Sequence, residues 1–390
     1  MSSLRIVPDA AVLCADGKIL AVGPRKDVEQ SSLLSTALIY DCQRGVVLPG
    51  FVDSHTHPVF TAPRLIDFEK RLSGASYEEI AAAGGGIRSS ATGVRLAKLE
   101  ELTKHVLSGI ERLVAEGTTT VECKTGYGLT VESELRSLQA IRSAAGKWMG
   151  TTFSTLLGAH TVPAELKDRP DEYVDIVCNE MIPRAAENKL ADFVDVFCEQ
   201  GAFTLSQTEQ IFKAATREGV PLRAHVGQFT AVELERLLRF RPVSLDHLDC
   251  VSDSDLQLLA QSETIAILLP GAAYFLGHKE YPSARRFIDA GVAVALATDY
   301  NPGTSPTTSM PMILSLACTQ MKMSVEEAIA AATINGAHAL RFAEWKGTIE
   351  TGKDADLAIL DAREYREVAY WFGSSRCLAT VLGGTLVEHR

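Results

Sequence analysis

The chain has 390 residues, 46% of them hydrophobic, which is enough to fill the core of one large barrel or of two medium-sized domains. Its 38 basic and 49 acidic residues give a net charge of -11, and no Lys/Arg cluster could follow a phosphate backbone, so we expect no nucleic-acid partner. The start lacks a basic segment followed by an apolar one, and no apolar stretch approaches about twenty residues, so we expect a cytoplasmic protein without a membrane partner.

The two ends of the chain carry the strand patterns of a small β-domain. Near the N-terminus, apolar residues alternate on both sides of Asp16 and Gly17, which is a strong hairpin signal. Near the C-terminus, residues 355–361 and 379–388 are predicted strands, the second interrupted by a tight Gly-Gly turn. We therefore predict one small domain that combines residues 1–44 and 346–390.

Between these ends, short apolar segments alternate with helical patterns. Before the second segment, Leu99, Leu102, Val106, Ile110 and Leu113 recur at the spacing of an amphipathic helix. This alternation is typical of parallel crossover units, and eight of them predict an α/β fold, a (β/α)8 TIM barrel over residues 45–345. An insertion is predicted at residues 58–98, with a short helix that begins at Ser76. The predicted strands lie within residues 46–57, 119–126, 152–160, 192–201, 221–228, 242–249, 264–271 and 292–303.

Five of the nine histidines lie at the ends of predicted strands, where barrels of this kind place their catalytic groups. They are His55, His57, His160, His225 and His247, and Asp299 follows the eighth strand. His55 and His57 are two residues apart, so both side chains point to the same side of their strand. We predict that His55, His57, His225 and Asp299 bind one divalent metal ion, Zn²⁺ or Fe²⁺, and leave a position open for water.

Longer motifs extend this pattern. GFVDSHTH, the single histidines on the fifth and sixth strands and the aspartate after the eighth resemble the amidohydrolase superfamily. Within it, ASYEEIAAAGGGI, KTGYGL and DYNPGTSPT resemble the imidazolonepropionase family. The resemblance implies a barrel with a small β-sandwich domain formed by both termini. It also implies hydrolysis of 4-imidazolone-5-propanoate to N-formimidoyl-L-glutamate.

The resemblance also implies roles for individual residues. Arg64 would hold the propionate carboxylate of a small anionic substrate, and an Arg fork matches a carboxylate. His247 would polarise the ring carbonyl or assist deprotonation of water, and Asp299 would carry the proton to the departing ring nitrogen. Further substrate contacts are implied for Tyr127, His160, Gln228, Asn301, Gly303 and Thr304. The stretch HVGQF departs from the family pattern, which weakens the expectation for Gln228.

Several alternatives stay open at this point. Lys124 could be a carbamylated, bridging ligand as in binuclear relatives, although a structural role is the preferred interpretation. The same metal shell would serve a ring deaminase, and a barrel of this kind could also be a non-catalytic scaffold. The sequence does not decide between zinc and iron, nor the oligomeric state, for which a homodimer is one option.

Overall fold

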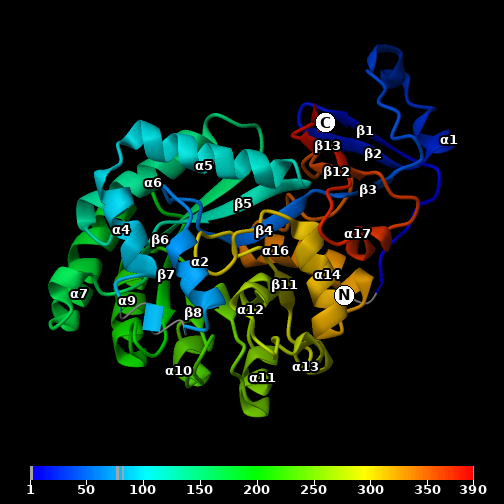
Figure 1. Ribbon diagram of the computed structural model, residues 1–390. Helices are drawn as coiled ribbons and strands as arrows, with labels where there is room; N and C mark the ends of the chain where they lie inside the picture. Colours follow the sequence, from blue (N-terminus) through cyan, green and yellow to red (C-terminus); the bar gives the residue numbers. More distant parts are fainter. Residues whose placement is uncertain (1–2, 76–78, 81–82, 390) are drawn as a thin grey trace.

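The computed structural model describes residues 3–75, 79–80 and 83–389, and its centre is a barrel of eight parallel strands (Figure 1). The strands pair in chain order from β4 to β11, which confirms the predicted (β/α)8 barrel. Each predicted segment contributes one strand to the barrel. They are β4 (Phe51–Thr56), β5 (Thr118–Lys124), β6 (Thr151–Ala159), β7 (Phe193–Cys198), β8 (Leu222–Val226), β9 (Ser244–His247), β10 (Ile265–Leu268) and β11 (Val294–Leu296).

The seam between β4 and β11 closes just beyond the end of β11. The backbone N–H of Asp299 donates to the carbonyl of His55 at 3.1 Å, and that of His57 donates to the carbonyl of Tyr300 at 2.8 Å. These bonds continue the parallel pairing past the short eighth strand. The closure therefore sets Asp299 beside both histidines of the first barrel strand.

Helices surround the barrel. The predicted amphipathic helix is α5 (Leu99–Val114), in which Leu102, Val106, Ile110 and Leu113 are fully buried. The main hydrophobic core lies between such helix faces and the outer face of the strands. The other outer helices are α6 (Val131–Ala145), α7 (Pro170–Ile176), the π-helical turn η3 (Val177–Met181), α8 (Ile182–Glu187), α9 (Leu205–Arg217), α10 (Leu234–Leu238), α11 (Asp253–Ala260), α12 (Pro270–Leu276), α13 (Ala284–Asp289), α14 (Met310–Met321), α15 (Val325–Ala331) and α16 (Ile334–Ala339).

The predicted insertion contributes α2 (Leu65–Leu72) and α4 (Ile87–Leu96) near the mouth of the barrel (Figure 1). Helix α2 packs on α12 through stacked Phe68 and Phe275 rings, and Arg71 donates to the carbonyl of Gly303 at 3.1 Å. The helix start predicted at Ser76 lies outside the described residues. A short 3-10 turn, η2 (Ala164–Leu166), follows β6.

Strands from both ends of the chain meet beside the barrel, as predicted. β1 (Ala10–Ala15) and β2 (Lys18–Pro24) form the hairpin, and β3 (Val46–Pro49), β12 (Leu357–Leu360), β13 (Cys377–Leu382) and β14 (Thr385–Glu388) form an antiparallel sheet. Short helical segments complete this region: α1 (Arg25–Val28), η1 (Ser32–Thr36) and α17 (Glu367–Tyr370).

One detail of the predicted strands is wrong. The segment 46–57 is not one strand, because β3 pairs with β12 of the small sheet and the barrel strand β4 starts after Gly50. A Cβ at Gly50 would lie 2.2 Å from the Thr119 side chain, so only glycine allows the chain to pass this close to the neighbouring strand. Among the described residues, every helix is too short or too polar to cross a membrane.

Candidate active site

Four side chains from three parts of the barrel meet at the carboxyl ends of the strands. His55 belongs to β4, His225 to β8, and His57 and Asp299 follow β4 and β11. Nε2 of His57 lies 3.2 Å from Nε2 of His55 and 3.3 Å from Nε2 of His225. Oδ1 of Asp299 lies 3.5 Å from Nε2 of His55 and 3.4 Å from Nε2 of His57. The four predicted metal ligands, each at most 3% exposed, are thus linked pairwise by these contacts. Their donor atoms fall into two overlapping groups, each with all atoms within 4.8 Å of one another: His55 with His57 and Asp299, and His55 with His225 and His247.

The separations among His55, His57 and Asp299, and that between His57 and His225, are those expected of atoms that share a divalent cation. A tetrahedral ion with bonds of about 2.0–2.1 Å needs ligand atoms about 3.3–3.4 Å apart. Burial, reinforced by Lys124, holds the pKa of His55 well below its usual range, and burial with His225 does the same to His57. Neutral imidazoles offer lone pairs to a metal, and three nitrogens around one carboxylate suit zinc or iron. The donor set therefore fits the group that the sequence predicts.

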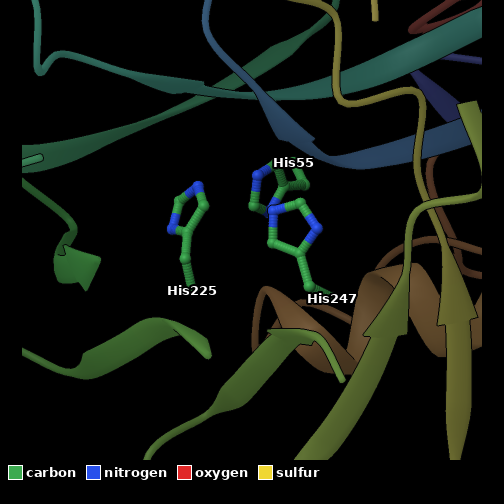
Figure 2. A group of neighbouring side chains, drawn as sticks. All are labelled: His55, His225 and His247. Carbon is green, nitrogen blue, oxygen red and sulfur yellow. The ribbon is translucent and has the colours of Figure 1, made fainter. Parts of the chain in front are cut away.

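His247 and Asp299 occupy unusual backbone conformations at this point. The φ angle of His247 is 79° and that of Asp299 is 53°, both in the left-handed region that non-glycine residues rarely adopt. Such strain persists where surrounding structure enforces it, often at functional sites. Figure 2 shows the His247 ring beside His55 and His225, with ring centroids 5.9 Å and 5.5 Å away. Burial, opposed in part by Asp299, lowers the pKa of His247 to about 3.

Five fully buried charged side chains form a cluster in the barrel interior beside the histidines: Glu122, Lys124, Asp195, Arg223 and Asp246. Of these, the sequence analysis singled out only Lys124. Nζ of Lys124 lies 2.8 Å from both Glu122 and Asp195, while Arg223 donates to Asp246 at 3.1 Å. Each of these side chains is 0% exposed. Lys124 is thus engaged by carboxylates in the barrel interior, which supports its preferred structural interpretation. A charge in the middle of an apolar strand was the available signal, since such a residue must find its partner inside the barrel.

Arg64 reaches the site from the start of α2. Its Nε donates to Oγ of Ser90 at 2.9 Å, and its guanidinium lies 5.2 Å from the centre of the Tyr127 ring. Nη2 is buried and has no hydrogen-bond partner among the described residues. A Cβ at Gly303 would lie 2.3 Å from Nη1 of Arg64, so glycine makes room for the guanidinium. His160 completes this wall, with its ring 5.3 Å from that of Tyr127.

The loop that carries Tyr127 is held by a carboxylate that sequence reasoning missed. Glu134, fully buried in the first turns of α6, accepts backbone N–H donors from Gly126 at 3.0 Å, Gly128 at 2.7 Å and Leu129 at 2.8 Å. Three such bonds fix the backbone on both sides of Tyr127. The KTGYGL motif therefore folds around the carboxylate of Glu134. This residue lies outside the motif, four residues after Thr130, the N-cap of α6.

The turn after β11 uses its polar side chains internally. Oδ1 of Asn301 accepts from the backbone N–H of Gly303 at 2.8 Å and of Thr304 at 2.7 Å. The Thr304 hydroxyl donates to Oδ2 of Asp299 at 3.3 Å. These contacts show that Asn301 shapes the turn and that Thr304 orients Asp299. Direct substrate contacts of Asn301, Gly303 and Thr304 remain predictions.

Gln228 is buried in the loop that follows β8, three residues after His225. Glu199, at the end of β7, holds this loop because its carboxylate accepts from the backbone N–H of Phe229 at 2.9 Å and from the Thr230 hydroxyl. The loop that departs from the family pattern is therefore well anchored. A substrate contact of Gln228 remains a prediction.

Comparison with known proteins agrees with this geometry. The amidohydrolase family matches residues 46–387. The imidazolonepropionase of Solibacter usitatus is 44% identical over 391 residues, covering 100% of this chain and 93% of that protein.

Two solved structures show the same fold at 18% identity. They are 5-methylcytosine deaminase from Klebsiella pneumoniae liganded with phosphonocytosine (TM-score 0.75, 97% of this chain and 94% of that one) and a mutant atrazine chlorohydrolase from Arthrobacter aurescens complexed with zinc and atraton (TM-score 0.69, 97% and 90%). The full-length match is the decisive one. The chain therefore belongs to the amidohydrolase family and, within it, to the imidazolonepropionases.

Proposed function

We propose that this chain hydrolyses the cyclic amide of 4-imidazolone-5-propanoate. One water adds to the ring carbonyl carbon, the ring C–N bond breaks, the departing nitrogen takes a proton, and N-formimidoyl-L-glutamate is released. The observation that carries the proposal is that contacts of 3.2–3.5 Å link three Nε2 atoms and one carboxylate oxygen, those of His55, His57, His225 and Asp299, in a buried site. The full-length match to imidazolonepropionases supports the choice of substrate.

One divalent ion, Zn²⁺ or Fe²⁺, would be held by His55, His57, His225 and Asp299. When bound, such an ion supplies Lewis-acid activation of water and of a carbonyl oxygen. The chain itself contributes the arrangement of the ligand atoms, their burial away from water and the polar side chains beside them. His57 and His225 are 3% exposed and His55 is fully buried, so the charge that develops there is little screened by water.

Arg64 would bind the propionate carboxylate. A half-buried guanidinium with a donor that is unpaired among the described residues is a strong anion site. It also supplies the local cation that an anionic substrate needs on a chain of net charge -11. Tyr127 and His160 form the adjoining aromatic wall, against which the flat imidazolone ring would pack. The carboxylate would thus be fixed at Arg64, and the ring would lie toward the histidines.

His247 and Asp299 would handle the protons. Asp299 lies among the imidazole nitrogens and would take a proton from the attacking water and give it to the departing ring nitrogen. His247, neutral near pH 7, would donate a hydrogen bond to the carbonyl oxygen as negative charge develops there. Thr304 would hold Asp299 in position through its 3.3 Å hydrogen bond.

The test is an assay of the purified protein on 4-imidazolone-5-propanoate and on a panel of guanine-like and cytosine-like rings, with metal analysis of the same sample. We expect turnover of the imidazolone only, with N-formimidoyl-L-glutamate as the product. Release of ammonia from a ring of the panel, without imidazolone turnover, would instead make the site a deaminase. Absence of turnover on every substrate by metal-loaded protein would favour the scaffold interpretation.

A further inference from the structure

The carboxylates of the buried charge cluster contact the far side of two proposed metal ligands. Nδ1 of His55 lies 2.6 Å from Oδ2 of Asp246, and Nδ1 of His225 lies 3.1 Å from Oδ1 of Asp195. An ionised carboxylate only accepts hydrogen bonds, so each Nδ1 must carry the ring proton. Each Nε2 is then left as a lone pair directed at the centre of the site, which is the tautomer that a metal ligand requires.

Lys124 is the cation that joins the two carboxylates. Its Nζ lies 2.8 Å from Oδ2 of Asp195 and 3.8 Å from Oδ2 of Asp246. Asp195 therefore uses one oxygen for His225 and the other for Lys124. Arg223 adds a second support, since its Nη2 lies 3.1 Å from Oδ2 of Asp246 and donates to the carbonyl of Ser54 at 2.7 Å.

We propose that Lys124 is a positioning residue of the metal centre. It acts through Asp195 and Asp246, which fix the tautomer and the ring orientation of His225 and His55. The inference rests on the proposed function, because it takes these histidines as metal ligands. Partners in this outer layer of a metal site change metal affinity strongly when they are lost.

The charges of the cluster support the same assignment. Two cations, Lys124 and Arg223, stand against three carboxylates, those of Glu122, Asp195 and Asp246, which leaves one net negative charge. Asp299 adds a second, and a divalent cation would neutralise both. Without Lys124, the buried carboxylates would lose half of their compensating charge and Asp195 would be free to rotate away from His225.

The experiment compares Lys124→Met with a matched control, Lys346→Met. Lys346 is 5% exposed and forms ion pairs with Asp354 at 3.0 Å and with Asp356, beside the small sheet and away from the histidines. Both substitutions remove one buried, paired ammonium. For each protein, the zinc dissociation constant is measured by competition with a chromophoric chelator, and the thermal midpoint is measured without metal.

We expect both variants to lose thermal stability, while only Lys124→Met weakens zinc binding, by about 10- to 100-fold. Asp195→Asn, whose amide can present its N–H to His225 in place of an acceptor, should weaken zinc binding by a similar factor and serves if Lys124→Met does not fold. Unchanged zinc affinity in the folded variant at Lys124 or at Asp195, or an equal loss in Lys346→Met, would overturn the inference. Failure of the wild-type chain to bind one zinc ion would instead contradict the proposed metal centre.

Discussion

Replacing Arg64 with methionine tests how the substrate is recognised. Methionine keeps an unbranched apolar stem and removes the guanidinium. Nη2 of this group is buried and finds no partner in the described part of the chain, and Nη1 occupies the space left by Gly303. A hydrogen bond to a charged group is worth about 1.5–3 kcal/mol. KM for 4-imidazolone-5-propanoate should therefore rise by about ten- to 150-fold, with unchanged metal content and a smaller effect on kcat.

The assay that isolates this interaction is a cycle of two enzymes and two substrates. Wild type and Arg64→Met are each measured on the propionate and on its neutral propionamide analogue. Wild type should prefer the carboxylate by the factor above, and the variant should barely distinguish the two substrates. Lys70→Met, which removes a positive charge from the same helix, should keep the wild-type preference. An Arg64→Met variant that still preferred the carboxylate as strongly as wild type would refute the assignment.

Four further predictions follow from the contacts of the site. Gly303→Ala should raise KM about tenfold, the worth of about 1.4 kcal/mol, because its Cβ displaces Arg64; unchanged KM would exclude this close packing. Glu134→Ala should lower the free energy of unfolding by about 3 kcal/mol or more in urea titrations, because three backbone N–H groups lose their acceptor, and a stable variant would contradict that role. His247→Asn should keep its metal and lose about 10²- to 10⁴-fold in kcat, and near-normal turnover would remove it from the mechanism. Burial, with Asp299 and Glu199, raises the pKa of Asp249 to about 7. Between about pH 4 and 7 the folded chain therefore keeps a proton that the unfolded chain has lost, and the free energy of unfolding falls by about 1.4 kcal/mol per pH unit as pH rises. Urea titrations of Asp249→Asn should lack this part of the fall.

The barrel was predictable because its signals are local and repeated. Each of the eight apolar segments supplies one barrel strand, and the buried face of α5 follows the spacing of its leucines, valine and isoleucine. Histidines at strand ends could be placed together because parallel strands finish at one face of a barrel. This topological rule, rather than any single motif, brings His55 and His225 into contact although 170 residues separate them in the chain.

Contacts that depend on side-chain pairing across the barrel were not predictable in the same way. The alternation of an apolar strand shows that Asp195 and Asp246 point inward, but it does not say which cation or imidazole each will meet. The contacts of Glu134 could not be predicted either, because they depend on a loop that folds back over the helix that carries this residue. The end of β3 was missed because a single glycine divides one apolar run between two sheets.

The central claim is that one cation, held by three imidazoles and one aspartate, makes the site active. The most direct test is to strip the protein of metal and to follow hydrolysis of 4-imidazolone-5-propanoate while zinc is added back in measured steps. The account predicts no activity at the start and a linear rise that ends at one ion per chain. Full activity of the stripped protein, or a rise that continues to two ions per chain, would contradict it.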